Sequence, residues 1–594
     1  MLKKREEIDT KYKWRLEDIY ADEAAFQQDF DQVLQLIKEE TAIKGTLGNS
    51  AGDFLKGMQW SEQLERKTEK LYVYSRMKRD EDNSNPNYQA MFDRVQSLSV
   101  RVSGATSFLV PEILSIPEEQ LKKMVQEDDL KIYTHFIDEL LRQKEHILSP
   151  EEERLLAMTA DISTASSNVF TMLNNADIKF PVIKDEKGQE VEVTKGRYGT
   201  FMESSDRRVR QDAFKALYGS YGKIKNTLGA TLSSSVKKDI FYTRVRKYNS
   251  ALEAALDQDN VTTDVYDSLI ASVHANLEHM YRYMKLRKKM LGLDELHMYD
   301  IYVPLVKDFK MEVAYEEAWD KIIAGLKPLG EEYCSLLIKG RDQGWIDVYE
   351  NQGKTSGAYS WGAYDTHPYV LLNYDNKLDD VFTIAHEMGH SLHTYYSNSH
   401  QPFIYGQYTI LLAEVASTVN ESLLIDYMIK QSRQREEKMY LINHYLEQFR
   451  GTVYRQTMFA EFEKIIHEKV EQGEALTPDL LNKIYRDLNS LYYGPDVFLD
   501  PEIDLEWARI PHFYSAFYVY KYATGFSAAT ALKKQILEEG QPAVERYLNF
   551  LKSGSSDYPL NLLKKAGVDL STPQPVEDAL QYFGELVAQF EALV

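Results

Sequence analysis

Apolar residues recur every three or four positions along most of the chain, a spacing that predicts amphipathic helices. The longest stretches with this spacing cover residues 149–173, 264–291, 311–340, 432–472 and 542–553. The first stretch opens with Ser149-Pro150-Glu151-Glu152, a helix-start pattern, and its apolar residues follow at Leu155, Leu156, Met158 and Ile162. We therefore expect a mainly helical protein.

Short apolar runs typical of strands are few. Residues 179–183 and 190–193, joined by Asp185-Glu186-Lys187-Gly188, predict a β-hairpin. Residues 357–359 and 369–374 predict a small sheet just before a helix over residues 379–396. We place a domain boundary near residue 200, so that residues 1–200 form an N-terminal helical region ending in the hairpin and residues 201–594 form a larger domain.

The composition is that of an ordinary globular protein. The 594 residues carry a net charge of −22, with 43% hydrophobic and 27% charged residues. The negative charge disfavours binding to nucleic acid and to anionic membranes. No apolar run reaches the ~18 residues needed to span a bilayer, and no signal peptide is evident. A single cysteine, Cys334, excludes an intrachain disulfide. These features predict a cytoplasmic protein, and the sequence indicates no obligate protein partner.

The helix predicted over residues 379–396 contains His386, Glu387 and His390. Histidines four residues apart lie one turn apart on the same face, so both rings can bind one cation. Glu387 is placed to reach a water on that cation rather than the cation itself. Zinc lowers the pKa of a bound water to about 7, and a neighbouring carboxylate can pass its proton to a leaving amine. The motif therefore predicts a zinc hydrolase.

A third ligand has to come from elsewhere in the chain. The extended motif HExxHxxGxxH needs glycine and histidine where this chain has His393 and Tyr396. A separate helix predicted over residues 408–421 carries Glu414 among apolar and small residues, and a buried carboxylate is costly unless it is paired or binds a metal. Glu421, two turns further on, is placed either to orient a histidine ring or to form a structural salt bridge.

Taken together, these motifs resemble those of the M3 peptidases, specifically the bacterial oligoendopeptidase F branch. The matching runs are His386-Glu387-Met388-Gly389-His390-Ser391-Leu392-His393, Ala413-Glu414-Val415-Ala416-Ser417-Thr418, Gly357-Ala358-Tyr359-Ser360, Pro368-Tyr369-Val370-Leu371-Leu372-Asn373, Ile510-Pro511-His512-Phe513-Tyr514 and Phe517-Tyr518-Val519-Tyr520-Lys521-Tyr522-Ala523-Thr524-Gly525. The likeness runs from about residue 200 to the C-terminus and is weaker before it.

This resemblance implies a mainly helical, two-lobed metallopeptidase with a deep central channel and a small sheet beside the helix that carries the histidines. It implies one zinc ion per chain, with His386, His390 and Glu414 as ligands and Glu387 as the catalytic base. The implied reaction is the hydrolysis of internal peptide bonds in short, unstructured oligopeptides. Folded proteins would be excluded from such a channel.

The resemblance also assigns a substrate-binding role to Gly357, Ala358 and Tyr359. In such enzymes this segment is an edge strand, and the substrate backbone adds to it as a further strand. We therefore expect oligopeptides to be the partners of this protein.

The segment from His512 to Tyr522 is rich in hydroxyl groups. A tetrahedral intermediate carries a developing oxyanion, which tyrosine hydroxyls or a histidine can stabilise. On a regular helix Tyr514, Tyr518 and Tyr522 share one face and Tyr520 points elsewhere. Sister branches of the family use one histidine and two tyrosines here at a different spacing, and we predict that His512, Tyr518 and Tyr520 have this role. Amphipathic packing is the alternative for each tyrosine.

Other functions remain open at this point. A zinc carboxypeptidase or dipeptidase would need a basic residue in the cleft to capture a terminal carboxylate. A peptide-binding protein without turnover would be expected to lack a ligand or the base, and this chain keeps all of them. A structural zinc site would use four protein ligands, usually including cysteine. The same ligand set also accepts cobalt or manganese.

Overall fold

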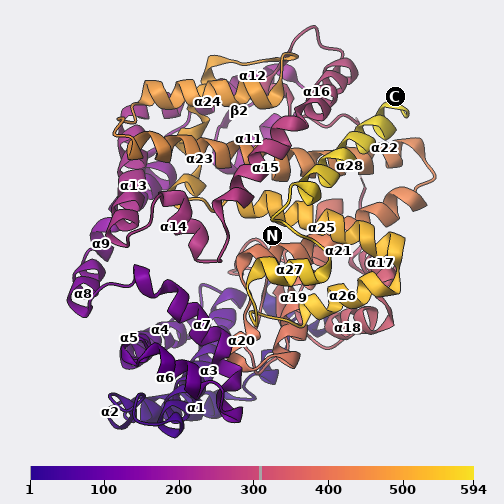
Figure 1. Ribbon diagram of the computed structural model, residues 1–594. Coiled ribbons are helices and arrows are strands. Elements are labelled where there is room, and N and C mark those ends of the chain that lie inside the picture. The colour runs from indigo at the N-terminus through magenta and orange to yellow at the C-terminus, as the bar shows by residue number, and fades with distance from the viewer. Residues whose placement is uncertain (1, 307–308, 310) are drawn as a thin grey trace. The chain divides into compact units, whose positions relative to one another are not determined.

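A computed structural model of the chain describes residues 2–306, 309 and 311–594 and is mainly helical, with only short strands (Figure 1). The fold class predicted from the apolar spacing is confirmed. Among the described residues, no helix combines the length and the apolar character needed to cross a membrane.

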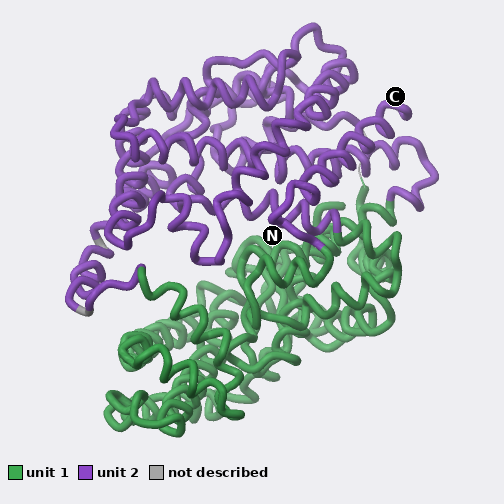
Figure 2. The backbone as a smooth tube through the Cα atoms, viewed as in Figure 1, with its two compact units in different colours: residues 1–145, 311–428, 532–567 green, residues 146–310, 429–531, 568–594 purple. Residues whose placement is uncertain are grey.

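The chain forms two compact units, and each unit is built from three separate segments (Figure 2). Unit 1 contains residues 1–145, 311–428 and 532–567. Its helices are α1 (Glu23–Ile37), α2 (Glu40–Ile43), α3 (Ala51–Glu81), α4 (Pro86–Thr106), α5 (Leu109–Ser115), α6 (Glu118–Met124), α7 (Thr134–Gln143), α17 (Tyr315–Leu326), α18 (Glu331–Asp342), α19 (Leu378–His400), α20 (Phe403–Gly406), α26 (Gln541–Leu551) and α27 (Pro559–Ala566). Its strands are β4 (Ile346–Asp347), β5 (Tyr359–Trp361) and β6 (Tyr369–Leu371).

Unit 2 contains residues 146–310, 429–531 and 568–594. Its helices are α8 (Pro150–Met158), α9 (Ala160–Ser163), α10 (Ala165–Met172), α11 (Lys195–Met202), α12 (Arg207–Gly222), α13 (Lys225–Val245), α14 (Ala251–Asp257), α15 (Thr263–Ala275), α16 (Leu277–Leu291), α22 (Arg435–Phe449), α23 (Arg455–Glu471), α24 (Pro478–Tyr493) and α28 (Gln574–Glu591), and its strands are β1 (Val182–Lys184), β2 (Glu190–Glu192), β3 (Leu296–His297) and β7 (Val497–Phe498). Helix α21 (Ile410–Gln431) begins in unit 1 and ends in unit 2, and α25 (Tyr520–Glu539) does the reverse. The domain boundary placed near residue 200 stays a prediction.

Several helices are shorter than the apolar spacing predicts. Residues 149–173 form α8, α9 and α10 in succession rather than one helix. At Thr159 the backbone N–H donates to the carbonyl oxygens of Leu156 and Ala157, three and two residues earlier, and the side-chain hydroxyl also donates to the Leu156 carbonyl oxygen, at 2.7 Å. Hydroxyls that compete for backbone carbonyls weaken a regular helix. Residues 311–340 likewise divide into α17 and α18, because Gly330 between them has φ of +95°, outside the helical range.

The two predicted strand regions do form sheets. β1 and β2 pair as the expected antiparallel hairpin. In unit 1, β6 lies between β4, which is parallel to it, and β5, which is antiparallel. β5 is therefore an edge strand, and both β5 and β6 contact α19, the helix of the histidine motif.

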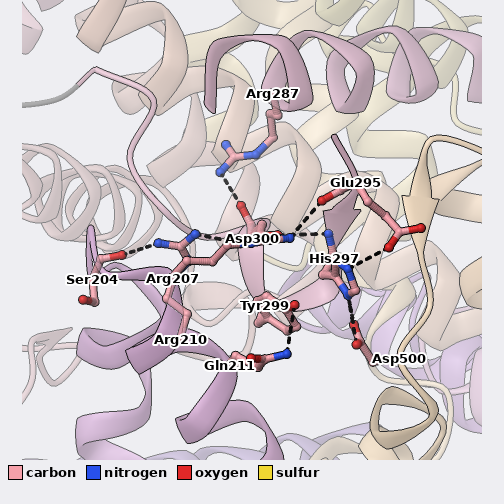
Figure 3. A network of polar contacts seen from close by, with 10 residues as sticks. All are labelled: Ser204, Arg207, Arg210, Gln211, Arg287, Glu295, His297, Tyr299, Asp300 and Asp500. Carbon is pink, nitrogen blue, oxygen red and sulfur yellow. Dashed lines mark hydrogen bonds and ion pairs between the residues drawn. The ribbon is translucent and has the colours of Figure 1, made fainter. Parts of the chain in front are cut away.

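Unit 2 contains a buried network around Asp300 (Figure 3). The Asp300 side chain is fully buried and accepts hydrogen bonds from Nη2 of Arg207 (2.8 Å) and Nη2 of Arg210 (2.7 Å), both on α12. Arg287 of α16 donates to the Asp300 backbone oxygen (3.4 Å). Burial alone would raise the pKa of Asp300, but the two arginines on α12 lower it. Through these bonds, the network holds the segment around Asp300, which follows α16, against α12.

Candidate metal centre and active site

Helix α19 carries the histidine motif in the core of unit 1. Its buried apolar residues recur about one turn apart, as Val381, Ile384, Ala385, Met388 and Leu392. This face packs against neighbouring elements that include α17, α18 and α26. His386 and His390 lie on an adjacent face and are partly buried.

Gly389 allows α21 to lie directly against α19. A Cβ atom at residue 389 would be only 2.6 Å from Cα of Ser417 and 2.9 Å from the carbonyl oxygen of Ala416. Asn420 joins the same two helices, because its Nδ2 donates to the carbonyl oxygen of Ala385 (3.0 Å). This close approach brings Glu414 of α21 next to the histidines of α19.

The ligand atoms of His386, His390 and Glu414 all lie within 4.8 Å of one another. The Nε2 atoms of the two histidines are 3.1 Å apart, and Nε2 of His386 is 3.8 Å from Oε2 of Glu414. Two nitrogen ligands of a tetrahedral zinc ion, each about 2.0–2.1 Å from the metal, are separated by about 3.3 Å. The three side chains therefore fit a single ion.

Each histidine ring has a second partner that orients it. Nδ1 of His386 lies 2.5 Å from Oε1 of Glu421, and His390 donates to the backbone carbonyl of Ala413. Such bonds fix a ring so that its remaining nitrogen points at the metal position. The two Nε2 atoms face each other at 3.1 Å, where they can share either a proton or a cation. The chemistry of the donor set thus also fits a metal.

The two histidines differ in their electrostatic surroundings. Burial and, to a smaller extent, the neighbouring His386 lower the pKa of His390 to about 3. For His386, burial also lowers the pKa, but Glu421 and the other nearby carboxylates raise it to about 9. For the carboxyl group of Glu414 burial has the opposite effect and raises the pKa. Several carboxylates therefore surround the position that a cation would occupy.

Glu387 is buried, with 8% of its surface exposed. Burial raises its pKa to about 7; His386 opposes the rise, whereas Glu414 and Glu421 add to it. The backbone N–H of Ser360 donates to this carboxylate and lowers its pKa slightly. A carboxyl group with a pKa near 7 can both take up and release a proton at neutral pH.

Strand β5 runs beside Glu387. Ser360 bonds to Glu387 through its N–H, and its Oγ is 2.8 Å from Oγ of Ser391 on α19. Successive residues of a strand direct their backbone N–H and C=O groups alternately toward one edge and the other. The N–H and C=O groups of Ala358 and Ser360 therefore point away from β6. The open edge of β5 is therefore next to Glu387.

The three residues predicted to bind substrate lie where β5 begins. Gly357 is exposed, and Ala358 and Tyr359 are partly buried. Gly357 has φ of +87°, a left-handed conformation that favours glycine. Asn373 supports this turn, because its Nδ2 donates to the carbonyl oxygen of Gly357 (2.8 Å).

The tyrosine-rich segment belongs to unit 2 and is not a regular helix. Pro511–Tyr514 is a 3-10 turn, α25 begins only at Tyr520, and Phe517 between them has φ of +55°. Tyr514 is separated from the later tyrosines, and its hydroxyl lies 2.7 Å from Oγ1 of Thr231. The single helical face expected for Tyr514, Tyr518 and Tyr522 is therefore not formed.

His512, Tyr518 and Tyr522 instead form an aromatic cluster. The ring centres are 6.3 Å apart for His512 and Tyr518, 6.0 Å for His512 and Tyr522, and 5.5 Å for the two tyrosines. Tyr520 is fully buried, with its ring centre 5.3 Å from that of Tyr266. The segment thus brings His512 and Tyr518 together and directs Tyr520 into the core of unit 2.

Two residues of this region were not singled out from the sequence. Gly389 carries a signal, because a glycine inside a helical pattern often marks close packing. Ser360 stands in one of the matching runs, but its contact with Glu387 could not be predicted, because that contact joins a strand to a helix and depends on the fold.

Comparison with known proteins relates the whole chain to one family. The sequence model of peptidase family M3 matches residues 200–582, and that of oligopeptidase F matches residues 112–180. The chain is 50% identical to oligopeptidase PepF of Bacillus subtilis over 99% of this chain and 88% of that protein. It is 41% identical to the group B oligopeptidase PepB of Streptococcus agalactiae over 99% of this chain and 98% of that protein.

Solved structures share the fold. A peptidase from Chlamydophila abortus has a TM-score of 0.93 at 36% identity and covers 100% of both chains. Oligoendopeptidase F from Enterococcus faecium has a TM-score of 0.75 at 40% identity and covers 96% of this chain and 99% of that one. The sequence matches and the His-His-Glu cluster agree, and the chain therefore belongs to peptidase family M3 and is a metallopeptidase.

Proposed function

We propose that this protein is a zinc-dependent endopeptidase that hydrolyses internal bonds of short, unstructured oligopeptides in the cytoplasm. The observation that carries the proposal is the cluster of His386, His390 and Glu414, with Glu387 beside it. Two relatives that align over nearly the full length of the chain are named oligopeptidases. Peptides are therefore the substrate class that fits best.

In this proposal His386, His390 and Glu414 hold the zinc ion, and Glu421 orients the ring of His386. When bound, zinc supplies a Lewis acid that polarises the scissile carbonyl and makes a neighbouring water more acidic. Glu387 takes a proton from the attacking water and delivers it to the leaving amine nitrogen. Burial favours the protonated form of Glu387, which helps the side chain hold the proton between the two transfers.

The substrate backbone pairs with the open edge of β5, along Gly357, Ala358 and Tyr359. Pairing through main-chain groups requires an extended peptide and places few demands on its side chains. A folded protein does not offer such a strand, which accounts for a preference for short, unstructured peptides. The deep channel implied by the family resemblance would also favour short, unstructured peptides over folded proteins.

His512 and Tyr518 are the proposed oxyanion donors, because they lie in one aromatic cluster of unit 2. Burial lowers the pKa of His512, and the charge of Arg455 adds to this, so the ring is neutral at pH 7 and can donate one hydrogen bond. Tyr520 was predicted for the same role, but its complete burial disfavours it. Tyr522, which contacts both His512 and Tyr518, is the better candidate for a second tyrosine.

The experiment that tests this function uses a doubly blocked peptide of about eight residues, long enough to span several substrate positions along an edge strand. Purified, zinc-loaded protein is incubated with the peptide, and mass spectrometry locates any cut. We expect internal cleavage that is lost on addition of a chelator and restored by zinc.

A zinc exopeptidase is the alternative within the same family of reactions, and the blocked peptide separates the two. Trimming of free-ended peptides without internal cleavage would replace the endopeptidase proposal with the exopeptidase. If zinc-loaded protein cuts no member of a broad panel of peptides, the proposed function is wrong.

A further inference from the structure

The segment that leads into β5 is held by the C-terminal end of α3. The Asp80 side chain on α3 is buried, with 1% of its surface exposed. Its Oδ1 accepts a hydrogen bond from Oγ1 of Thr355 (2.8 Å), and its Oδ2 accepts one from the Tyr359 hydroxyl (2.9 Å). The backbone oxygen of Asp80 accepts the N–H of Thr355 (2.9 Å). One residue of α3 thus holds both ends of the segment 355–359.

Neighbouring residues reinforce this attachment. Nε of Arg76 lies 3.2 and 3.1 Å from the two carboxylate oxygens of Asp80 and offsets their charge. Asn83, just beyond α3, donates from its N–H to the carbonyl oxygen of Gly353 (2.7 Å) and from Nδ2 to Oγ1 of Thr355 (2.8 Å). A buried carboxylate is costly unless polar groups satisfy it, and here two of those groups are hydroxyls of the segment before and within β5.

β5 is fixed on both of its faces. Side chains alternate along a strand, so Tyr359 and Ser360 point to opposite sides. Tyr359 is attached to α3 through Asp80, whereas Ser360 is attached to α19 through Ser391 and through Glu387. The position of the open edge relative to Glu387 therefore depends on both attachments.

We propose that Asp80 is a positioning residue for peptide hydrolysis, which acts through the Tyr359 hydroxyl to hold β5 where an extended substrate pairs with it. The inference rests on the proposed function. It gives a part in substrate binding to α3, a helix that lies before the region 200–582 matched by the family M3 model. A strand that is ordered before the substrate arrives lowers the entropic cost of adding the peptide. Main-chain pairing is equally strong in the ground state and the transition state, so its loss raises KM rather than lowering kcat.

The test compares Tyr359→Phe, which removes only the hydroxyl, with Asp80→Asn and a matched control. The control is Tyr20→Phe, because the Tyr20 hydroxyl donates to Oδ2 of Asp29 at the same 2.9 Å, also within unit 1. With a doubly blocked peptide, Tyr359→Phe and Asp80→Asn are expected to raise KM about tenfold, the scale of one hydrogen bond to a charged group. Their kcat should change little, and Tyr20→Phe should leave both constants near those of the wild type.

Hydrogen exchange at the amides of residues 357–361 provides a readout that needs no turnover. We expect faster exchange there in Tyr359→Phe and Asp80→Asn, and no change in Tyr20→Phe. Unchanged exchange in Tyr359→Phe overturns the inference, and so does an equal rise in KM for Tyr359→Phe and Tyr20→Phe. If the wild type cuts no blocked peptide, the proposed function fails, while the exchange data still decide whether Asp80 holds β5.

Discussion

Two buried glutamates, Glu387 in unit 1 and Glu506 in unit 2, differ strongly in their affinity for a proton. Their exposed fractions are similar, 8% and 3%. Burial raises the pKa of Glu387 to about 7. Burial acts in the same direction on Glu506, but Arg455 and Arg509 outweigh it and lower its pKa to about 2. The cationic partners, rather than the depth of burial, therefore determine the protonation of a buried carboxyl group.

The geometry around Glu506 explains its low pKa. Its Oε1 accepts hydrogen bonds from Nη2 of Arg455 (2.6 Å) and Nη2 of Arg509 (2.6 Å), and its Oε2 accepts one from the Tyr485 hydroxyl (2.6 Å). Asp300, also in unit 2, has the same kind of environment with two arginines (Figure 3). These carboxylates are locked in the ionised form and hold the fold together, whereas Glu387 is left able to exchange a proton.

The largest expected effect is on catalysis, from Glu387→Gln. If Glu387 is the base, this variant should lose ~10²–10⁴-fold in kcat/KM on the blocked peptide. It should unfold at a temperature no lower than that of the wild type, because the substitution removes a charge that burial disfavours. Kinetics and thermal unfolding of the same preparation measure both quantities. A variant that keeps most of its activity would exclude Glu387 as the base.

Glu506→Gln should instead act on stability. Removing the carboxylate leaves Arg455 and Arg509 without their shared anion, and breaking a buried pair in this way costs about 3–5 kcal/mol. Urea unfolding at neutral pH measures the loss. The matched control is Glu186→Gln, at an exposed position in the β1–β2 hairpin, which should stay within about 0.5 kcal/mol of the wild type. Equal effects of the two substitutions would contradict the structural role of Glu506.

The pH dependence of stability sharpens the same point. The folded pKa of Glu506, about 2, lies below its ordinary value of 4.5, so its contribution is complete above pH 4.5 and is lost as the pH falls toward 2. The shift corresponds to about 3 kcal/mol. The stability difference between the wild type and Glu506→Gln should therefore shrink between pH 4.5 and pH 2, and a difference independent of pH would contradict this account.

The smallest effect is expected at Glu463, a buried carboxylate of unit 2 that has no arginine partner among the described residues. Glu463 is fully buried, its Oε1 accepts the N–H of Phe517 (3.0 Å), and burial raises its pKa well above the usual value of 4.5. A raised folded pKa means that stability falls as the pH rises above 4.5. Glu463→Gln should therefore raise the unfolding temperature at pH 7 but not at pH 4, and a variant less stable at both pH values would show that the carboxyl group itself is needed.

The sequence was sufficient for the features that depend on local spacing. The helical period predicted a mainly helical protein, and the four-residue spacing of His386 and His390 put both rings on one face of α19. Glu414 was recognisable because a carboxylate among apolar and small residues needs a special partner. Each of these inferences uses residues within a few turns of one another.

Features that depend on contacts between distant segments were out of reach. The apolar residues Leu155, Met158 and Ile162 follow a helical pattern, yet they are 56%, 67% and 75% exposed, because spacing alone does not specify what covers a helix. The left-handed φ of Phe517 ended the regular helix on which the arrangement of the tyrosines had been predicted. The attachment of Tyr359 to Asp80 likewise joins residues far apart in the chain.

The central claim is that His386, His390 and Glu414 bind the ion, whereas Glu387 transfers protons during the reaction and is not a ligand. The most direct test is the zinc content of purified variants after zinc loading and removal of free metal. The account predicts one ion per chain in the wild type and in Glu387→Gln, because Glu387 is not a ligand, and loss of most of the zinc in Glu414→Gln. Full zinc content in Glu414→Gln, or its loss in Glu387→Gln, would contradict this division of roles.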